Sequence, residues 1–240
     1  MAPKYRKLRT GQRKKGNASL EALRKRYASF QESSEAFYRE LDGVNWNEVT
    51  APADRVTFVS NPISRVNQEP ICLQVLLELS ENAGERIYLQ SPYTIPSRRM
   101  RNLYRNYDID ASTVTLLTNS EVSSPNLLGI SAYMRHRPKI LEGNVNIYEF
   151  NGMGSIHAKS AIFDDSTSVV GTFNIDPRSS YLNTESMVVI ESKPFTSLLE
   201  ERIHQDFEQS ILLTSPGDTS VKKIVIRIFS FIMPLFEHLL

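Results

Sequence analysis

The chain has 240 residues, of which 40% are hydrophobic and 23% charged, a balance that excludes wholesale disorder and suits one large α/β domain or two small ones. It has a single cysteine, Cys72, which excludes an internal disulfide and a metal site built on a cysteine pair, so the chain fits a reducing compartment. We expect Cys72 to pack in the core. The net charge of +1 is unevenly distributed: residues 1–27 hold ten Lys or Arg against one acidic residue, a charge of +9, which leaves −8 for the rest.

The basic segment at residues 1–17 contains glycine, and we expect it to be poorly ordered. No apolar core follows it, so it is not a secretory signal. It suits contact with an anionic surface, either lipid headgroups or nucleic acid, and composition alone does not choose between them. Apolar residues near helical spacing then predict a helix over 18–42, ended by Gly43. These residues are Leu20, Leu23, Tyr27, Phe30, Phe37 and Leu41.

After a linker at residues 45–54, strand-like and helix-like segments alternate. Strands are predicted at residues 56–59, 86–90, 112–117, 144–150 and 167–172. Helices are predicted at residues 69–83, 96–107 and 125–142. This alternation predicts an α/β fold, a mixed β-sheet flanked by helices on both faces, over residues 51–215. We assign residues 1–50 to a basic arm and connector helix.

Residues 216–240 form a tail that is more apolar than the rest of the chain. Lys222, Lys223 and Arg227 precede an apolar stretch that is too short to span a bilayer, which needs about 20 residues. This order suits an amphipathic helix lying in a membrane interface. A C-terminal helix docked on the core is an equal alternative.

The chemistry-bearing pattern is centred on His157 and Lys159. The residues that follow His157 are compatible with a strand, in which positions two apart point to the same face, so the two side chains are expected to project together. An imidazole beside an ammonium group favours attack on an anionic phosphorus centre. Lys159 neutralises the non-bridging oxygens, and His157 acts as nucleophile or proton carrier near neutral pH.

Three further residues complete the predicted site or support it. Asn174 is expected to donate an amide proton to the same phosphate. Glu185 is expected to accept a hydrogen bond from a ring nitrogen of His157, which would fix its tautomer and stabilise the imidazolium. Asp164 lies an odd number of residues from His157, so we expect it to turn away and to take a structural role. The remaining histidines have no partner pattern and are expected to be structural or solvated: His136, His204 and His238.

The pattern His157-x-Lys159-x4-Asp164-x6-Gly171-x-x-Asn174 resembles the HKD signature of the phospholipase D superfamily. Its continuation, through Asn174-Ile175-Asp176-Pro177-Arg178-Ser179 to Asn183-Thr184-Glu185, is similar to the bacterial cardiolipin synthase branch. Upstream segments fit the second half of the same branch: Ser91-Pro92-Tyr93, Thr118-Asn119-Ser120, Ser131-Ala132-Tyr133 and Asn146-Ile147-Tyr148-Glu149-Phe150. The resemblance covers roughly residues 45–215, and the basic helix before it resembles the connector between two halves.

The resemblance implies a phosphatidyl transferase that works through a phosphohistidine, with no metal and no cofactor. It implies catalytic roles for His157, Lys159, Asn174 and Glu185, and structural roles for Asp164 and Gly171. Candidate substrate contacts are Arg178 and Thr172. Tyr93 and Tyr133 are candidates as well, with core and sheet packing the favoured alternative for both. Thr172 stands where the family often has serine, a change that keeps the hydroxyl. The expected partners are a phospholipid such as phosphatidylglycerol and a membrane surface, with nucleic acid less favoured, at the cytoplasmic side of an inner membrane with peripheral association.

One element of the family's machinery is not found in these 240 residues, because no second His-x-Lys occurs in them. Family members pair two motifs: one histidine attacks phosphorus, and the other protonates the leaving alcohol. The resemblance implies the acid/base role for His157, with a second half-site from another chain or from a homodimer. Two alternatives stay open, a homodimeric single-motif nuclease or phosphodiesterase and an inactive truncated half of a two-motif enzyme.

Overall fold

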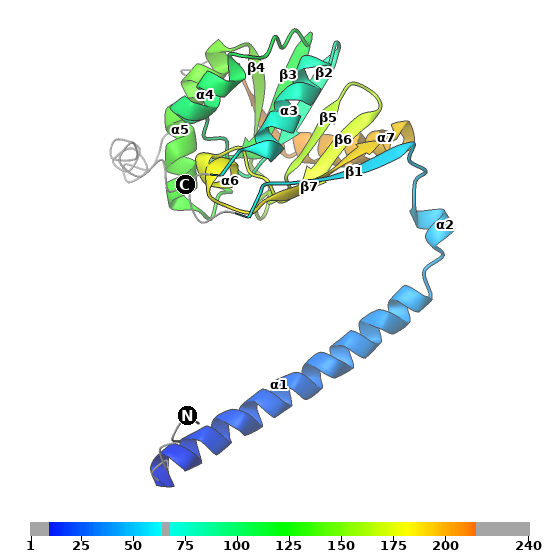
Figure 1. The fold of residues 1–240 in the computed structure, drawn as a ribbon, viewed down its shortest axis with the longest axis vertical. Coiled ribbons are helices and arrows are strands. Elements are labelled where there is room, and N and C mark those ends of the chain that lie inside the picture. Colours follow the sequence, from blue (N-terminus) through cyan, green and yellow to red (C-terminus); the bar gives the residue numbers. More distant parts are fainter. Residues whose placement is uncertain (1–9, 64–67, 215–240) are drawn as a thin grey trace, which may run out of the picture. The chain divides into compact units, whose positions relative to one another are not determined.

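A computed structural model describes residues 10–63 and 68–214 of the chain. Contacts divide the chain between Thr50 and Ala51 into two compact units. The described part of the first unit holds helix α1 (Thr10–Asp42) and the short helix α2 (Trp46–Val49) (Figure 1). The helix predicted over 18–42 is confirmed, but it begins at Thr10, so the expectation of poor order is wrong for residues 10–17. Each glycine in residues 10–17 destabilises the helix by about 1 kcal/mol relative to alanine. The neighbouring Gln, Arg and Lys residues are good helix formers and offset this effect.

The second unit is built on a mixed sheet, in which the described residues form eight strands in the order β1-β7-β6-β5-β2-β3-β4-β8. Strands β2, β3 and β4 run parallel to one another, and all other neighbours are antiparallel. The bounds are β1 (Arg55–Ser60), β2 (Arg86–Gln90), β3 (Thr113–Asn119), β4 (Val145–Phe150), β5 (Ser160–Phe163), β6 (Thr167–Gly171), β7 (Ser186–Glu191) and β8 (Ser210–Leu213).

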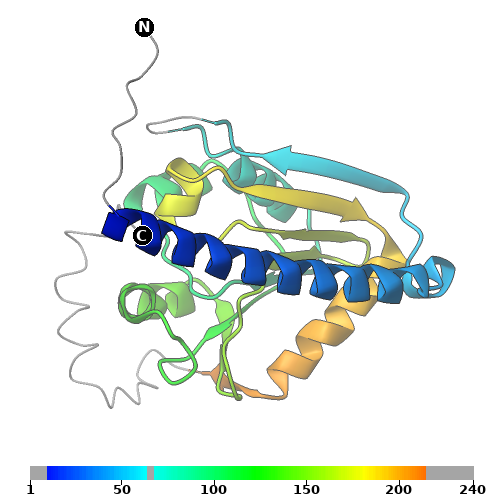
Figure 2. The same ribbon diagram turned by 90° about the horizontal axis from the view of Figure 1, so that it is seen from below.

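Helices cover both faces of this sheet, because successive strand residues point to opposite sides. On one face, Leu116 of β3 packs against α5 (Leu127–Glu142), and the same face carries α3 (Ile71–Glu81) and α4 (Arg98–Tyr104). On the other face, Leu117 joins a cluster with Ile203 of α7 (Lys193–Phe207). Figures 1 and 2 show α7 and α3 on opposite sides of the sheet. The α/β class with helices on both faces is therefore confirmed.

The predicted strands and helices agree with the structure to within a few residues, with one exception at β5. That strand begins at Ser160, whereas a strand was expected from His157 onward. The apolar tail at residues 216–240 lies outside the described residues. Within the described part of the chain, no helix combines the length and the apolar character needed to cross a bilayer.

Several strand ends meet at one edge of the sheet, and this edge positions the candidate site. Strands β2, β3 and β4 end there, while β5 and β7 begin there because they run antiparallel to their neighbours. The short helix α6 (Pro177–Tyr181) follows the end of β6 at the same edge. Polar loop residues from distant parts of the sequence are thus brought together.

Candidate active site

His157 and Lys159 lie in an irregular segment that leads into β5, so the expectation that both project from one face of a strand is wrong. His157 is exposed and Lys159 is half-buried. The two residues are nevertheless joined, since Nζ of Lys159 donates a hydrogen bond of 2.7 Å to the backbone carbonyl of His157. The pair is held together by a side chain-to-backbone contact rather than by strand alternation.

Asn119, at the end of β3, fixes the backbone immediately before His157. Its Oδ1 accepts a hydrogen bond of 2.8 Å from the N–H of Ile156, and its Nδ2 donates one of 2.8 Å to the carbonyl of the same residue. Nδ2 also donates to the carbonyl of Pro92 at 3.0 Å. Asn119 is only 1% exposed, so water does not compete for these bonds. The Asn119 side chain thus provides the backbone hydrogen bonds that a neighbouring strand provides in a regular sheet.

Glu185 is buried, and both of its carboxylate oxygens accept hydrogen bonds. Oε1 accepts hydrogen bonds from Ser179 at 3.0 Å and from Asn183 at 2.9 Å, and Oε2 accepts one from the hydroxyl of Thr172. No hydrogen bond joins Glu185 to His157 in the described structure, so the predicted contact is not present there. The carboxylate oxygens are instead oriented toward three donors near Glu185 in the sequence. The Thr172 hydroxyl, expected to contact substrate, is directed to Glu185 instead and accepts from the N–H of Ser186 at 3.1 Å.

Lys159, Glu185 and Asp176 form a cluster of opposite charges at this edge. Burial lowers the pKa of Lys159, and the negative charges of Glu185 and Asp176 oppose that shift. Burial raises the pKa of Asp176 to about 6; hydrogen bonds from Ser179 act against this, and the charge of Glu185 adds to it. The charges of the three groups therefore act on one another, with Asp176 and Glu185 buried and Lys159 half-buried.

Asn174 lies beside this cluster, and its amide oxygen is buried without a hydrogen-bond partner among the described residues. The oxygen and nitrogen of an asparagine amide are assigned from their surroundings, so a flipped amide would present its N–H₂ at the same place. An unpartnered buried amide is costly unless a further group satisfies it. The arrangement therefore leaves Asn174 available to a bound group.

Tyr93 and Arg178 border the cluster. Tyr93 packs so tightly over α5 that a Cβ at Gly129 would lie 2.8 Å from its ring. Burial raises the pKa of Tyr93, and Asp176 and Glu185 raise it further. Arg178 is exposed, and its Nε donates to Asn183 at 3.3 Å.

Tyr133, the second candidate tyrosine, packs in the core, as the favoured alternative had it, and does not join the cluster at the sheet edge. It is fully buried, and its hydroxyl donates a hydrogen bond of 2.9 Å to Glu149, which Arg137 also contacts at 2.9 Å. Because its only polar group is engaged inside the core, Tyr133 offers nothing to a substrate in this conformation.

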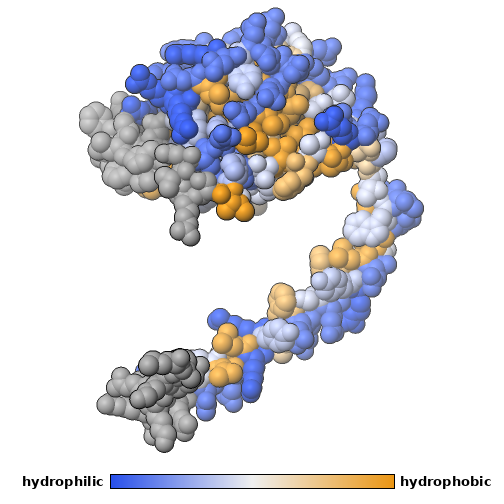
Figure 3. All heavy atoms as spheres, in the orientation of Figure 1, coloured by the Kyte–Doolittle hydropathy of each residue, from blue (hydrophilic) through white to orange (hydrophobic). Residues whose placement is uncertain are grey.

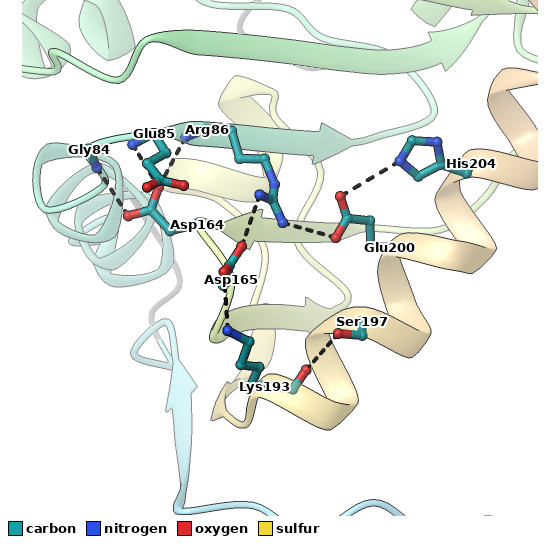
Figure 4. A network of polar contacts seen from close by, with 9 residues as sticks. All are labelled: Gly84, Glu85, Arg86, Asp164, Asp165, Lys193, Ser197, Glu200 and His204. Atoms are coloured by element: carbon teal, nitrogen blue, oxygen red, sulfur yellow. Dashed lines mark hydrogen bonds and ion pairs between the residues drawn. The ribbon is translucent and has the colours of Figure 1, made fainter.

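Gly171 and Asp164 have positions that explain their residue types. A Cβ at Gly171 would lie 2.6 Å from Cα of Met187, so β7 crosses too closely for any side chain. Asp164, at the far end of β5 from Lys159, accepts hydrogen bonds from the N–H groups of Gly84 (3.1 Å), Glu85 (2.9 Å) and Arg86 (3.0 Å) (Figure 4). Burial opposes ionisation of Asp164, but these three bonds outweigh it and lower the pKa.

Figure 4 also shows how the same end of the sheet is tied to α7. Arg86 forms ion pairs with Asp165 at 2.9 Å and with Glu200 at 3.0 Å. His204 lies 3.7 Å from Glu200, one turn away on α7. These contacts join β2 to the helix on that face and lie apart from the residues around Lys159.

Two buried asparagines that organise the site were not singled out from the sequence. Besides Asn119, Asn61 is 1% exposed and links α6, α3 and the residue before β7: it donates to the carbonyl of Ser179 at 2.8 Å, accepts from the N–H of Cys72 at 3.0 Å, and gives its own N–H to the carbonyl of Glu185 at 2.9 Å. Their place in the sequence could have identified them, since Asn61 and Asn119 each stand at the end of a strand. Cys72 is fully buried beside it, and burial raises its pKa to about 11, which confirms the packing role.

The model of the family described as "Cardiolipin synthase, PLD-like domain" matches residues 76–207, more than half of the chain. Cardiolipin synthase C of Escherichia coli is 28% identical over 205 residues, covering 77% of this chain and 43% of that protein. The chain spans 28% to 43% of the length of the curated relatives that it matches.

Solved structures agree on the fold. A phosphatidylserine synthase from Haemophilus influenzae superposes with a TM-score of 0.60 at 15% identity, over 77% of this chain and 48% of that one. Nuc, a phospholipase D family member from Salmonella typhimurium, superposes with a TM-score of 0.51 at 17% identity, over 67% of this chain and 99% of that one. The unit from Ala51 onward therefore has the fold of these proteins.

Proposed function

The chain belongs to the cardiolipin synthase family of phospholipase D-like domains, and on that premise we propose that it supplies one half-site of a phosphatidyl transferase. The observation that carries the proposal is the cluster of half-buried Lys159 with buried Glu185 and Asp176, beside the exposed His157. Such a site offers positive charge and a proton carrier to a phosphodiester while its own carboxylates stay out of solvent.

Lys159 neutralises a non-bridging phosphate oxygen in this proposal, and Asn174 donates an amide proton to the same group. Both contacts strengthen as negative charge develops on the equatorial oxygens, which is the requirement for lowering the barrier. His157 acts as the acid/base, protonating the leaving alcohol and then activating the acceptor alcohol. Its exposure suits a group that must meet two successive substrates.

Glu185 acts in this proposal through its neighbours rather than through a direct bond to the imidazole. It holds the Thr172 hydroxyl and the Asn183 amide, and its charge offsets the effect of burial on Lys159. The Glu185 charge therefore favours the cationic form of Lys159 in its half-buried position. The role is one of positioning and charge balance.

The nucleophilic histidine comes from a second half-site, since these 240 residues contain one His-x-Lys. Another chain or a second copy of this one supplies it. The substrate is a phospholipid such as phosphatidylglycerol at a membrane surface on the cytoplasmic side. The charge of +9 over residues 1–27 supports peripheral binding to anionic lipid.

The test is to incubate the full chain with phosphatidylglycerol vesicles in the presence of a chelator, alone and with a first-half polypeptide of a cardiolipin synthase. We expect cardiolipin or phosphatidic acid to form with the wild type and not with His157→Ala. No lipid product under either condition would remove the proposal. Chelator-resistant cleavage of DNA by the chain alone would favour a phosphodiesterase acting on nucleic acid instead.

A further inference from the structure

Helix α1 carries a stripe of large apolar side chains that the described residues of its own unit do not cover. Leu20, Leu23, Tyr27, Phe30 and Phe37 are each between 52% and 67% exposed. Figure 3 shows apolar side chains recurring along one side of α1 among hydrophilic ones. An exposed stripe of this length on a soluble helix usually marks a surface that another element covers.

The spacing of the stripe is that of a coiled coil. Leu20, Leu23, Tyr27 and Phe30 follow one another at steps of three, four and three residues. Ser34 occupies the position between Phe30 and Phe37 that completes the alternation, and Leu41 extends it by a further step of four. A repeat of 3.5 residues places every member on one narrow seam, the pattern by which two helices pack side by side. The helix has 33 residues, which makes it about 50 Å long, enough for several turns of such packing.

The charges on α1 divide into a basic part and an acidic part. Residues 15–26 carry four cations against one anion, and residues 27–42 carry four anions against one cation. In a parallel pair of identical helices like charges would lie side by side. In an antiparallel pair the basic part of one helix lies along the acidic part of the other, so the helix is complementary to a reversed copy of itself.

The positions flanking the seam make the same distinction. Arg26 and Glu40 occupy equivalent flanking positions, each one residue before a seam residue, Tyr27 and Leu41. Equivalent flanking positions meet across an antiparallel pair, so Arg26 faces Glu40 of the second copy, twice by symmetry. In a parallel pair Arg26 would face Gln31, and no opposite charges would meet there.

We propose that α1 pairs with α1 of a second copy of this chain as an antiparallel two-helix coiled coil. The occupant of the exposed stripe is thus the same stripe of the second copy. This inference does not depend on the catalytic activity proposed above, because it rests on the exposure, spacing and charge of α1 alone.

Sedimentation equilibrium of the full chain tests the pairing. We expect a dimer that dissociates on dilution. Leu23→Glu with Phe30→Glu should give a monomer at every concentration. The matched control is Ala22→Glu with Ser29→Glu, which adds the same charge one position away from the seam and should leave the dimer intact. A wild type that is monomeric throughout, or equal behaviour of the two double variants, overturns the proposal.

The orientation has its own test. Arg26→Glu should weaken dimerisation about tenfold, and adding Glu40→Arg should restore it, because the exchanged charges meet again only in the antiparallel arrangement. Spin labels at Glu21→Cys should lie about 30 Å apart along the axis, whereas a parallel pair would place them side by side. Cys72 is fully buried and escapes labelling. A double variant as weak as the single one, or labels side by side, contradicts the antiparallel arrangement.

Two outcomes would show that the stripe is covered by something other than a second copy. Suppose that the wild type is monomeric and that the seam variant, Leu23→Glu with Phe30→Glu, melts at a lower temperature than the wild type. The stripe then packs on its own chain, and the proposal fails. If the monomeric wild type binds anionic vesicles through α1 and the seam variant does not, the stripe is a membrane surface and the proposal fails equally.

Discussion

The side chain of Asn119 forms hydrogen bonds with both backbone groups of Ile156, each 2.8 Å long, although the two residues are 37 positions apart in the sequence. Ile156 directly precedes His157. The end of β3 therefore sets where the candidate proton carrier stands, and a change at Asn119 reaches the site without touching a substrate.

Replacing Asn119 by Ala should lower kcat by roughly tenfold to a hundredfold with a smaller change in KM, because the backbone before His157 loses its anchor. It should also cost about 1–3 kcal/mol of stability, since buried backbone groups lose partners. Hydrogen exchange at the Ile156 amide checks the cause and should accelerate. Asn106→Ala, at an exposed position, is the control. Unchanged exchange at Ile156 would show that Asn119 does not hold this segment.

Replacing Glu185 by Gln should lower the rate by about a hundredfold while the fold persists, because the isosteric amide still accepts hydrogen bonds but no longer offsets the burial of Lys159. The pKa of Lys159 should fall further, since Glu185 acts to raise it. In a profile of kcat against pH, the fall in kcat at alkaline pH should therefore begin at a lower pH than in the wild type. An identical profile would mean that the Glu185 charge does not act on Lys159.

Asp176 should make stability depend on pH between about 4 and 6. Its pKa is raised from 3.8 to about 6 in the folded chain, so the native state binds the proton first as the pH falls. Stability from this group is therefore greatest below pH 4 and is lost as the pH rises through 6, by on the order of 2–3 kcal/mol. Asp176→Asn should remove this dependence, measured as the difference in unfolding free energy between the two proteins at pH 4 and pH 7. A difference that does not vary with pH would contradict the shift.

Replacing Gly171 by Ala should destabilise the chain by about 1–3 kcal/mol, because the new methyl group meets the backbone of β7. Gly84→Ala is the matched control, since a Cβ there meets nothing within 4 Å. Urea unfolding of both variants decides the comparison. Equal midpoints would mean that β7 yields easily at this crossing.

Sequence periodicity was sufficient for most strands and helices because each is set by its own alternation of apolar residues. It failed before β5, where the backbone of Ile156 pairs with a side chain from β3 that no local pattern reveals. It failed again for the predicted contact between Glu185 and His157, since Glu185 accepts instead from Ser179 and Asn183, a few residues away, and from Thr172. Motif spacing names candidate site residues, but the contacts among them depend on which donors the fold brings closest.

The most direct test of the central proposal is the conversion of phosphatidylglycerol in vesicles by the full chain supplied with a second half-site. The account predicts that the wild type forms cardiolipin and that His157→Ala loses at least a thousandfold in rate. His204→Ala, on α7 and paired with Glu200, should retain the wild-type rate. Retained activity in His157→Ala would contradict the account.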